Sequence, residues 1–432
     1  MSSTSANATT DLNPAPPEPA TLTPEFLRAW FWHKQGLDGS LAGASPEQVL
    51  ATAGWARSVG GANPYLTLFA RAGITRKQTD QTVQNLDIHE LPTARGCTYV
   101  LGKSDFRWAL RLGADAALAS MKVLERLGVE RGEITLLEEQ VLHTLNEEQQ
   151  PLDPKQLREL LGESVRSLGE EGRKKGASTT LPTALGLLQA DGRIRRVPIN
   201  GRLDQQRYAY TAWQLTPNEN STAENSAEES STDENSNKLT DDGVRNLLMQ
   251  RYLGWTGGAT AKQSQWFTGF TVAQTKRALA AVGASEVTTA AGEQLWMLPD
   301  DVVRLGAFTS AKTEQIQLLA GTDSLFLLRR NAADYLDPAD KDKKVLDGTL
   351  ALQADLPDHP ILDRGRIIGL WQYDPGQEQI AYWLFVKETA AIKDRIKEVE
   401  AWIRDELGDF RSFSLDSAKS RQKRIDALNA AS

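Results

Sequence analysis

The apolar positions along the chain repeat mainly at the spacing of an α-helix. After Glu133 they fall three or four residues apart, which predicts an amphipathic helix; they are Ile134, Leu137, Val141, Leu142 and Leu145. The same spacing predicts a final helix over residues 389–407, ended by Gly408. The chain is therefore expected to contain many helices that each bury one face.

Helix starts are marked by a capping residue followed by proline. This pair sets the first helical φ and satisfies an unpaired backbone N–H group, and it occurs at Thr23-Pro24, Ser45-Pro46 and Asp153-Pro154. Gln48 and Gln156 stand where they complete capping boxes. Three helix starts can thus be placed from sequence.

A helical region is followed twice by a hairpin pattern. Helices from Glu133, from Pro154 and near Thr180 precede two strands joined by Asn200-Gly201, a strong hairpin-turn signal. Helices over 242–253, 259–267 and 271–282 precede "ASEVTTAAGEQLWML", which again predicts two strands. Three helices and a hairpin make a winged helix, so the unit is expected to be repeated.

Two further regions complete the predicted fold. Residues 23–112 resemble an irregular third copy, with "HELPTARGCTYVL" as its hairpin, and alternating residues around Asp374-Pro375-Gly376 predict a small antiparallel sheet. The expected class is α+β, with tandem winged-helix domains followed by a small antiparallel β-barrel or sheet and a C-terminal helix. The expected divisions are a disordered tail (1–22), a first winged-helix-like domain (23–130), a second winged helix with a basic wing (131–215), an acidic disordered linker (216–240), a third winged helix (241–305) and a β-barrel-like domain with a C-terminal helix (306–432).

Charge is distributed unevenly along the chain. The formal net charge is -8, but residues 216–242 alone hold eight acidic side chains and one lysine, a net of -7. Residues 172–208 hold eight basic and two acidic side chains, a net of +6. The acidic total therefore comes mostly from the linker, and a basic patch lies just before it.

Composition argues against several kinds of site. Cys97 is the single cysteine and the four histidines are scattered, so we expect no disulfide, no metal site and no cofactor. The sequence has neither a run of apolar residues long enough to span a membrane nor a secretory signal pattern at its start. We therefore expect a cytoplasmic, nucleoid-associated protein that is a monomer.

The basic wing predicts contacts with a DNA backbone. Cations on a wing can meet phosphates while the third helix enters the major groove; the candidates are Lys174, Lys175, Arg193, Arg195, Arg196, Arg202 and Arg207. The alternative is a solvated surface, or arginines paired with Asp191 and Asp204. A second basic cluster, Lys419 to Arg424, has the same two interpretations, and the eleven tryptophans are more readily explained by core packing than by stacking on a base.

The loop "GWARSVGGANP" is the candidate for an active site. Gly60-Gly61 permits close approach of another backbone, and Arg57, Ser58 and Asn63 supply polar groups. A plain turn between two helices is the competing interpretation.

The chain resembles the AlkZ-like DNA glycosylase family of bacteria. The resemblance runs from about Pro24 to Arg424 and rests on five segments: "LPTARGCTYVLGKSDFRWAL", "GEEGRKKGASTTLPTALGLLQADGRIRRVPINGRLDQQRYAYTAW", "GGATAKQSQWFTGFTVAQTKRALAAVG", "HPILDRGRIIGLWQYD" and "GDFRSFSLDSAKSR". It implies tandem winged helices and a β-barrel around a basic channel for duplex DNA. It also implies metal-independent excision of alkylated or crosslinked bases by hydrolysis of the N-glycosidic bond.

The resemblance also locates the expected catalytic motif. Family members position water with two glutamines, or glutamine and aspartate, separated by one residue and placed just after the second helix of the first unit. This chain has neither in "GWARSVGGANPYLTLFARAG", where Asn63 is the available amide, and it has Tyr99 where many relatives have histidine.

The sequence therefore predicts a double-stranded DNA-binding protein of DNA repair and leaves its enzymatic activity open. One hypothesis is a glycosylase in which Asn63, with Arg57 and Ser58, faces the damaged nucleotide. The alternative is a non-catalytic winged-helix protein with a regulatory or architectural role. A protein-interaction scaffold is a third hypothesis, and the acidic linker could also fold onto the basic wing as a DNA mimic.

Overall fold

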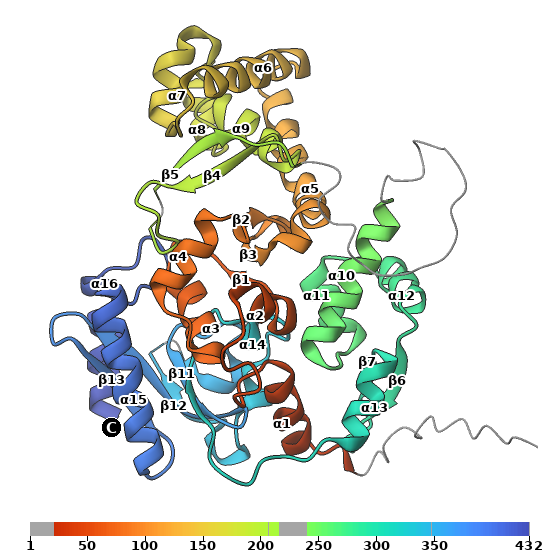
Figure 1. Cartoon of the computed structure of the whole chain (residues 1–432), viewed down its shortest axis with the longest axis vertical. Coiled ribbons are helices and arrows are strands. Elements are labelled where there is room, and N and C mark those ends of the chain that lie inside the picture. The colour runs from red at the N-terminus through yellow and green to blue at the C-terminus, as the bar shows by residue number, and fades with distance from the viewer. Residues whose placement is uncertain (1–20, 206, 216–239, 347, 432) are drawn as a thin grey trace, which may run out of the picture.

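The computed structural model describes residues 21–205, 207–215, 240–346 and 348–431. Most of the predicted tail, most of the acidic linker and the linker's suggested contact with the basic hairpin lie outside these residues. Leu22, the last residue of the predicted tail, is instead fully buried, because it packs in a small apolar core of the body. Figure 1 shows a group of helices at one end, α10 to α13 along one side, and a sheet with two long helices on the other side. No helix of the described residues is long and apolar enough to cross a membrane.

The N-terminal part consists of four helices and a small antiparallel sheet. The helices are α1 (Pro24–Lys34), α2 (Pro46–Ala53), α3 (Asn63–Ala72) and α4 (Arg76–Gln84), and the strands β1 (Ala56–Arg57), β3 (Thr98–Gly102) and β2 (Ile88–Pro92) are hydrogen-bonded in that order. The Ser45 capping box forms as predicted. The helices α3 and α4 are separate because α3 ends at Gly73 in the left-handed conformation (φ 70°).

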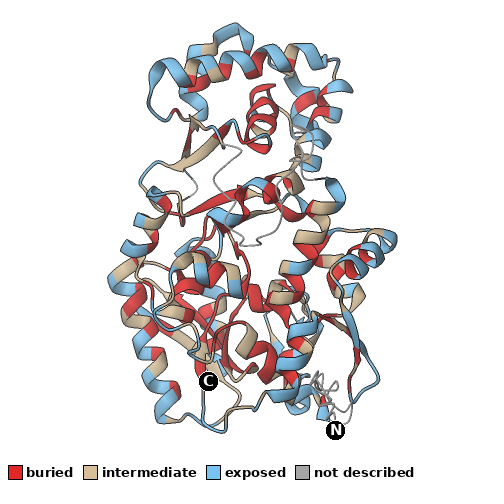
Figure 2. Ribbon diagram, turned by 45° about the vertical axis from the view of Figure 1, so that its right-hand side comes forward, coloured by how far each residue is buried: buried red, intermediate tan, exposed pale blue. Residues whose placement is uncertain are grey.

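A twenty-residue helix, α5 (Phe106–Glu125), leads to the group of helices at one end of the molecule. That group contains α6 (Arg131–Glu148), α7 (Pro154–Leu161), α8 (Gly169–Lys174), α9 (Leu181–Ala190) and the hairpin of β4 (Ile194–Pro198) and β5 (Tyr208–Ala212). The α6 positions Ile134, Leu137 and Val141 are buried in a core of the group's own. Figure 2 shows its outer surface as exposed.

The elements after the linker share a core with the N-terminal part. They are α10 (Asp241–Thr256), α11 (Ala261–Thr268), α12 (Val272–Ala281), β6 (Ser285–Thr288), β7 (Gln294–Met297) and α13 (Pro299–Ala307). Trp255 of α10 packs edge-on against Trp55, which also contacts Trp108. These tryptophans are buried, which confirms their interpretation as core residues.

The C-terminal part is built on an antiparallel sheet. Its four strands are hydrogen-bonded in the linear order β13 (Gln379–Leu384), β12 (Arg366–Asp374), β11 (His359–Asp363) and β8 (Ile316–Leu318), so the described strands form an open sheet. The other elements are α14 (Ser324–Leu327), β9 (Lys344–Val345), β10 (Gly348–Thr349), α15 (Ala390–Trp402), which a π turn extends to Leu407, and α16 (Ala418–Ala431). The predicted stop at Gly408 is confirmed (φ 77°).

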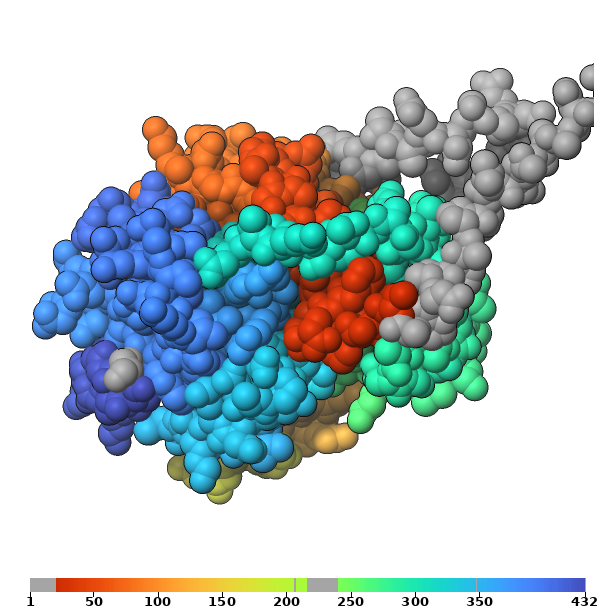
Figure 3. Space-filling model, turned by 90° about the horizontal axis from the view of Figure 1, so that it is seen from below, coloured from red at the N-terminus to blue at the C-terminus, as the bar shows by residue number. Residues whose placement is uncertain are grey.

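Long-range contacts join these parts into one body. Seen from below, α1 lies between the residues that follow α13 and the C-terminal half (Figure 3). The Lys34 ammonium and the Asp301 carboxylate are 2.8 Å apart, and the rings of Phe26 and Phe308 are 5.5 Å apart. Contacts of this kind hold segments that are distant in sequence next to one another, so that side chains from several of them can line one site.

Candidate functional site

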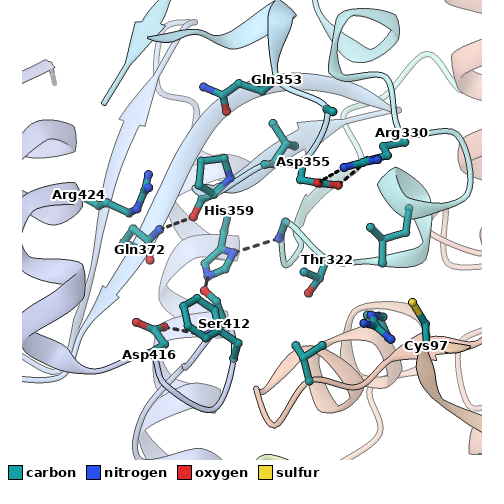
Figure 4. A pocket seen from close by; sticks show the side chains of 18 of the residues that line it. Cys97, Thr322, Arg330, Gln353, Asp355, His359, Gln372, Ser412, Asp416 and Arg424 are labelled. Atoms are coloured by element: carbon teal, nitrogen blue, oxygen red, sulfur yellow. Dashed lines mark hydrogen bonds and ion pairs between the residues drawn. The ribbon is translucent and has the colours of Figure 1, made fainter. Parts of the chain in front are cut away.

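A cavity of about 840 Å³ lies where the N-terminal sheet, α11 and the C-terminal part meet. Aromatic and aliphatic side chains line much of it, and so do five arginines: Arg57, Arg95, Arg330, Arg421 and Arg424. Its volume falls within the range of small-molecule sites. Figure 4 shows that its polar side chains come from several separate segments.

Arg57 reaches the cavity because α2 is followed at once by a strand. Gly54 ends the helix with φ 104°, and the two residues of β1 then pair with β3, which sets Arg57 opposite Tyr99. The Arg57 Nη1 donates to the Thr98 carbonyl at 2.9 Å, and its guanidinium lies 5.4 Å from the centroid of the Tyr99 ring. The Arg57 guanidinium is therefore held in place by a backbone carbonyl and by the Tyr99 ring.

Trp266 of α11 contacts two cations of the cavity. The guanidinium of Arg95 is 4.1 Å from its ring centroid, and that of Arg330 is 5.1 Å away. Arg330 also forms a two-pronged ion pair with Asp355, with an Nε–Oδ1 distance of 2.8 Å. Indole faces attract cations in this geometry, so Trp266 helps to fix both arginines.

His359 is a neutral hydrogen-bond donor in the cavity wall. Its Nδ1 accepts from the Gly321 backbone N–H at 3.0 Å, so the ring proton is on Nε2, which lies 3.3 Å from Ser412 Oγ. Burial, together with the smaller effect of the nearby Arg421 and Arg424 charges, lowers the pKa of His359 to about 3. The imidazole therefore donates to Ser412 without carrying charge.

Two carboxylates line the cavity, and they differ in access. Asp416 accepts from the Ser412 backbone N–H at 2.8 Å and from the Ser420 hydroxyl at 3.1 Å, and it is almost fully buried. The Asp355 side chain is 59% exposed. Asp355 is therefore the carboxylate that a ligand in the cavity can reach more readily.

The structure separates the three residues predicted to be catalytic. Arg57 lines the cavity, whereas Ser58 and Asn63 are buried and are not among its lining residues. Asn63 Nδ2 donates to the Arg57 carbonyl at 2.8 Å, and Asn63 Oδ1 accepts from Thr67 at 3.4 Å. In this position Asn63 can influence a ligand through the backbone of Arg57 and not by direct contact.

The glycine pair of the same loop approaches a backbone, but it is the protein's own. A Cβ atom on Gly61 would stand 2.4 Å from the Ser412 carbonyl oxygen. The Ala62 N–H donates to the Arg411 carbonyl at 2.8 Å, and the Ser414 N–H donates to the Val59 carbonyl at 3.0 Å. The loop therefore binds the segment that supplies Ser412 to the cavity.

The predicted DNA contacts divide into exposed residues and residues engaged in the fold. Four are exposed on the group of helices at one end: Lys174, Lys175, Arg193 and Arg207. Lys175 lies 3.4 Å from Glu171 of the same helix. These four side chains are accessible to a phosphate.

Three wing arginines instead face the protein. Arg202 pairs with Asp204, with an Nε–Oδ1 distance of 2.8 Å, and donates to the Leu407 carbonyl at 3.1 Å. Arg196 is half-buried, 4.6 Å from the centroid of the Tyr208 ring, and Arg195 is half-buried as well. The alternative of internal ion pairing thus describes Arg202, and the hairpin tip is anchored on the body.

Buried titratable groups of β2 lie near Arg195 and Arg196 of the β4–β5 hairpin. Burial, together with the smaller effect of the Arg195 and Arg196 charges, lowers the pKa of His89 to about 3. Burial raises the pKa of Glu90, while Ser58, Arg196 and Arg57 act against that rise. Arg421 of the C-terminal cluster is likewise structural, since its Nη2 contacts Asp409 at 2.7 Å.

Most of the cavity residues were not predicted from the sequence, because they lie far apart along the chain. Four of the five segments that carry the family resemblance nevertheless contribute to the lining. They supply Tyr99 from 91–110, Trp266 from 257–283, His359 and Gln372 from 359–374, and Ser412 and Asp416 from 408–421. The resemblance was the signal that could have found them. Within the described ranges, no three His, Cys, Asp or Glu side chains are grouped so that they could hold a metal.

Comparisons with known proteins agree with this architecture. A family model for AlkZ-like DNA glycosylases matches residues 53–409. The fold is similar to that of the DNA glycosylase AlkZ from Streptomyces sahachiroi, with a TM-score of 0.62 and 17% sequence identity over 90% of this chain and 97% of that one. A search of curated proteins gave no match. Because the family model covers most of the sequence, the chain belongs to the AlkZ-like DNA glycosylase family.

Proposed function

We propose that this protein binds duplex DNA and releases a damaged base by hydrolysis of its N-glycosidic bond. The base would enter the cavity between the N-terminal sheet and the C-terminal part. The observation that carries the proposal is the convergence of four family segments on one cavity lined by arginines. Enzymes that act on a base must take it out of the stack and into such a pocket.

Duplex binding is assigned to tandem winged helices. Residues 131–215 and 241–305 each contain helices followed by a hairpin, in the order expected for that unit. The exposed cations Lys174, Lys175, Arg193 and Arg207 would contact phosphates. Such contacts release counterions, so binding should weaken steeply as salt rises.

Exposed apolar side chains next to the cavity support base extrusion. Leu352 and Leu415 are each 84% exposed, and Phe413 is 49% exposed. Phe413 lines the cavity itself. Leu352 precedes the lining residue Gln353, and Leu415 lies three residues after the lining residue Ser412. Side chains of this kind can insert between base steps and hold the gap that an extruded base leaves.

The chemistry needs a group other than the expected motif. The stretch just after α2, residues 54–63, contains no glutamine, aspartate or glutamate; its Trp55 indole N–H donates to Asp105 at 2.9 Å, and neither Trp55 nor Arg57 can accept a proton from water. Asp355 is the accessible carboxylate of the cavity. A carboxylate there can orient water and stabilise the positive charge that develops on the sugar.

The test uses duplexes that carry alkylated bases or an interstrand crosslink. Purified protein is incubated with each duplex, abasic sites are cleaved, and strand breaks are counted. We expect breaks with the wild type, a loss of about 100-fold or more with Asp355→Asn, and wild-type activity with Asp394→Asn, an exposed aspartate of α15. Equal activity of the two variants would remove Asp355 from the mechanism, and no breaks with any lesion would contradict glycosylase activity.

A non-catalytic DNA-binding protein is the second candidate. The observation that favours it is that the stretch after α2, residues 54–73, contains neither the glutamine pair nor the glutamine–aspartate pair of the family. It predicts salt-sensitive binding that is equal for damaged and undamaged duplexes, without release of a base. A protein-interaction scaffold would instead show little salt-dependent affinity for DNA, so a titration at two salt concentrations separates all three.

A further inference from the structure

We propose that Gln372 and Ser412 form a recognition surface in the cavity for a nucleobase that carries an amine N–H next to a ring nitrogen, as adenine does. This inference rests on the proposed function, because it names the class of base that the cavity would select. Gln372 would accept a hydrogen bond from the amine, and Ser412 would donate one to the ring nitrogen.

The orientation of the Gln372 amide is fixed by two acceptors. Its Nε2 donates to the Pro357 carbonyl at 3.1 Å and to Asp358 Oδ1 at 3.0 Å. Asp358 is held in turn by Arg424, whose Nη1 is 3.2 Å from Asp358 Oδ2. Both partners of the amide nitrogen are oxygen atoms, so the amide cannot be reversed without losing both bonds.

This orientation leaves an unsatisfied acceptor in the cavity wall. Gln372 is 1% exposed, and its Oε1 has no hydrogen-bond partner in the part of the chain that the structure describes. An unpaired buried oxygen is costly, and a ligand N–H that reached it would recover that cost. The Gln372 oxygen therefore favours a base with an amine over one without.

Ser412 supplies the complementary donor. Its oxygen faces the neutral His359 Nε2–H at 3.3 Å, which directs the serine's own hydrogen away from the histidine. The Ser412 backbone is fixed by the Asp416 contact and by the close packing of Gly61. Figure 4 shows Gln372, His359 and Ser412 as neighbours in the cavity wall. Acceptor and donor are thus presented by a rigid framework.

The test measures binding of free bases to the full chain, without DNA. Adenine carries the amine, and purine has the same rings without it. We expect wild-type protein to bind adenine about fivefold or more tightly than purine, because pairing a buried acceptor is worth at least that much. Gln372→Leu should bring adenine down to the affinity of purine. Ser412→Ala should weaken both ligands and preserve their ratio, since both keep the ring nitrogen.

The outcomes distinguish this inference from the proposed hydrolysis. Equal affinities of the wild type for adenine and purine, an unchanged ratio in Gln372→Leu, or no adenine binding at millimolar concentration would each overturn it. Thermal unfolding shows whether both variants are folded. If Gln372→Leu is not folded, the test rests on Ser412→Ala, which should bind both ligands more weakly and keep the adenine-to-purine affinity ratio of the wild type. Selective adenine binding without release of any base from duplexes would support the recognition surface and contradict only the hydrolysis.

Discussion

Arg71 of α3 and Asp323, the residue that caps α14, form a fully buried two-pronged ion pair. The distances are 2.9 Å from Nη1 to Oδ2 and 2.8 Å from Nη2 to Oδ1, and both side chains are at most 1% exposed. Gln35 and Ser324 accept further hydrogen bonds from the guanidinium. The pair ties the helix that follows the candidate loop to the C-terminal part.

Removing one partner of this pair should destabilise the protein strongly. Arg71→Met leaves the Asp323 charge buried and unpaired, and we expect the free energy of unfolding to fall by about 3–5 kcal/mol. Arg404→Met removes an exposed pair with Asp405 and should cost less than about 1 kcal/mol. Urea denaturation measures both, and similar losses in the two variants would contradict the role given to the buried pair.

Gly61 should tolerate no side chain. Gly61→Ala places a Cβ atom 2.4 Å from the Ser412 carbonyl, so the loop and residues 411–414 must separate. We expect a loss of about 1–3 kcal/mol in stability. Gly186→Ala in α9, where an added Cβ meets nothing within 4 Å, should instead be neutral or stabilise by up to about 1 kcal/mol. Thermal unfolding of the two alanine variants compares them, and a stable Gly61→Ala protein would show that the contact is not tight.

The salt dependence of DNA binding should report on the exposed wing cations. Replacing Arg193 and Arg207 with alanine should lower affinity and reduce the slope of log K against log salt by about 1.8, if each meets one phosphate. Lys393 and Lys397, exposed on α15, form a matched control pair whose replacement should change neither quantity. Fluorescence anisotropy at several salt concentrations gives the slopes. Equal slopes for both double variants would show that the duplex does not contact Arg193 and Arg207.

His89 should make stability depend on pH. Its pKa is about 3 in the folded protein because of burial, against about 6.5 in an unfolded chain, so below pH 6.5 the unfolded state binds a proton that the folded state does not. Stability should therefore fall as pH drops from 6.5 towards 3, by about 2 kcal/mol at pH 5 from this residue.

A variant isolates the contribution of His89. Buried carboxyls such as Glu90, whose pKa is raised by burial, act in the opposite direction, so the wild-type curve alone does not report on one histidine. Between pH 7.5 and 5, His89→Leu should lose about 2 kcal/mol less than the wild type, and the exposed His143→Leu should follow the wild type. Parallel curves for His89→Leu and wild type would contradict a neutral buried imidazole.

Local signals predicted much of the fold. Capping boxes at Ser45 and Asp153 form as expected, because they depend on residues three positions apart. The hairpins around Asn200-Gly201 and Asp374-Pro375-Gly376 pair as predicted for the same reason. The division into winged-helix domains stays a prediction, and the shared core of Trp55 and Trp255 shows that the first and third units pack together.

The candidate site was less predictable because its geometry depends on distant contacts. Asn63 and Arg57 stand in one loop, but only the packing of α3 decides that the amide turns inward and the guanidinium outward. Arg202 is basic in sequence and yet is engaged with Asp204 and Leu407. Charge in a sequence shows which residues can meet a phosphate, whereas the fold decides which of them are still accessible.

The segment after α15 has a consequence for how the protein is made. Arg411 donates to the Asp204 carbonyl of the wing, accepts from the Ala62 N–H, and precedes the Ser412 of the cavity wall. These contacts span some of the longest separations in the chain, so they form late during synthesis and folding. A nascent chain of only the first four hundred residues lacks the residues that anchor the β4–β5 hairpin and complete the cavity wall, Leu407, Arg411 and Ser412. The emerging protein would stay inactive on DNA until nearly all of it has been translated.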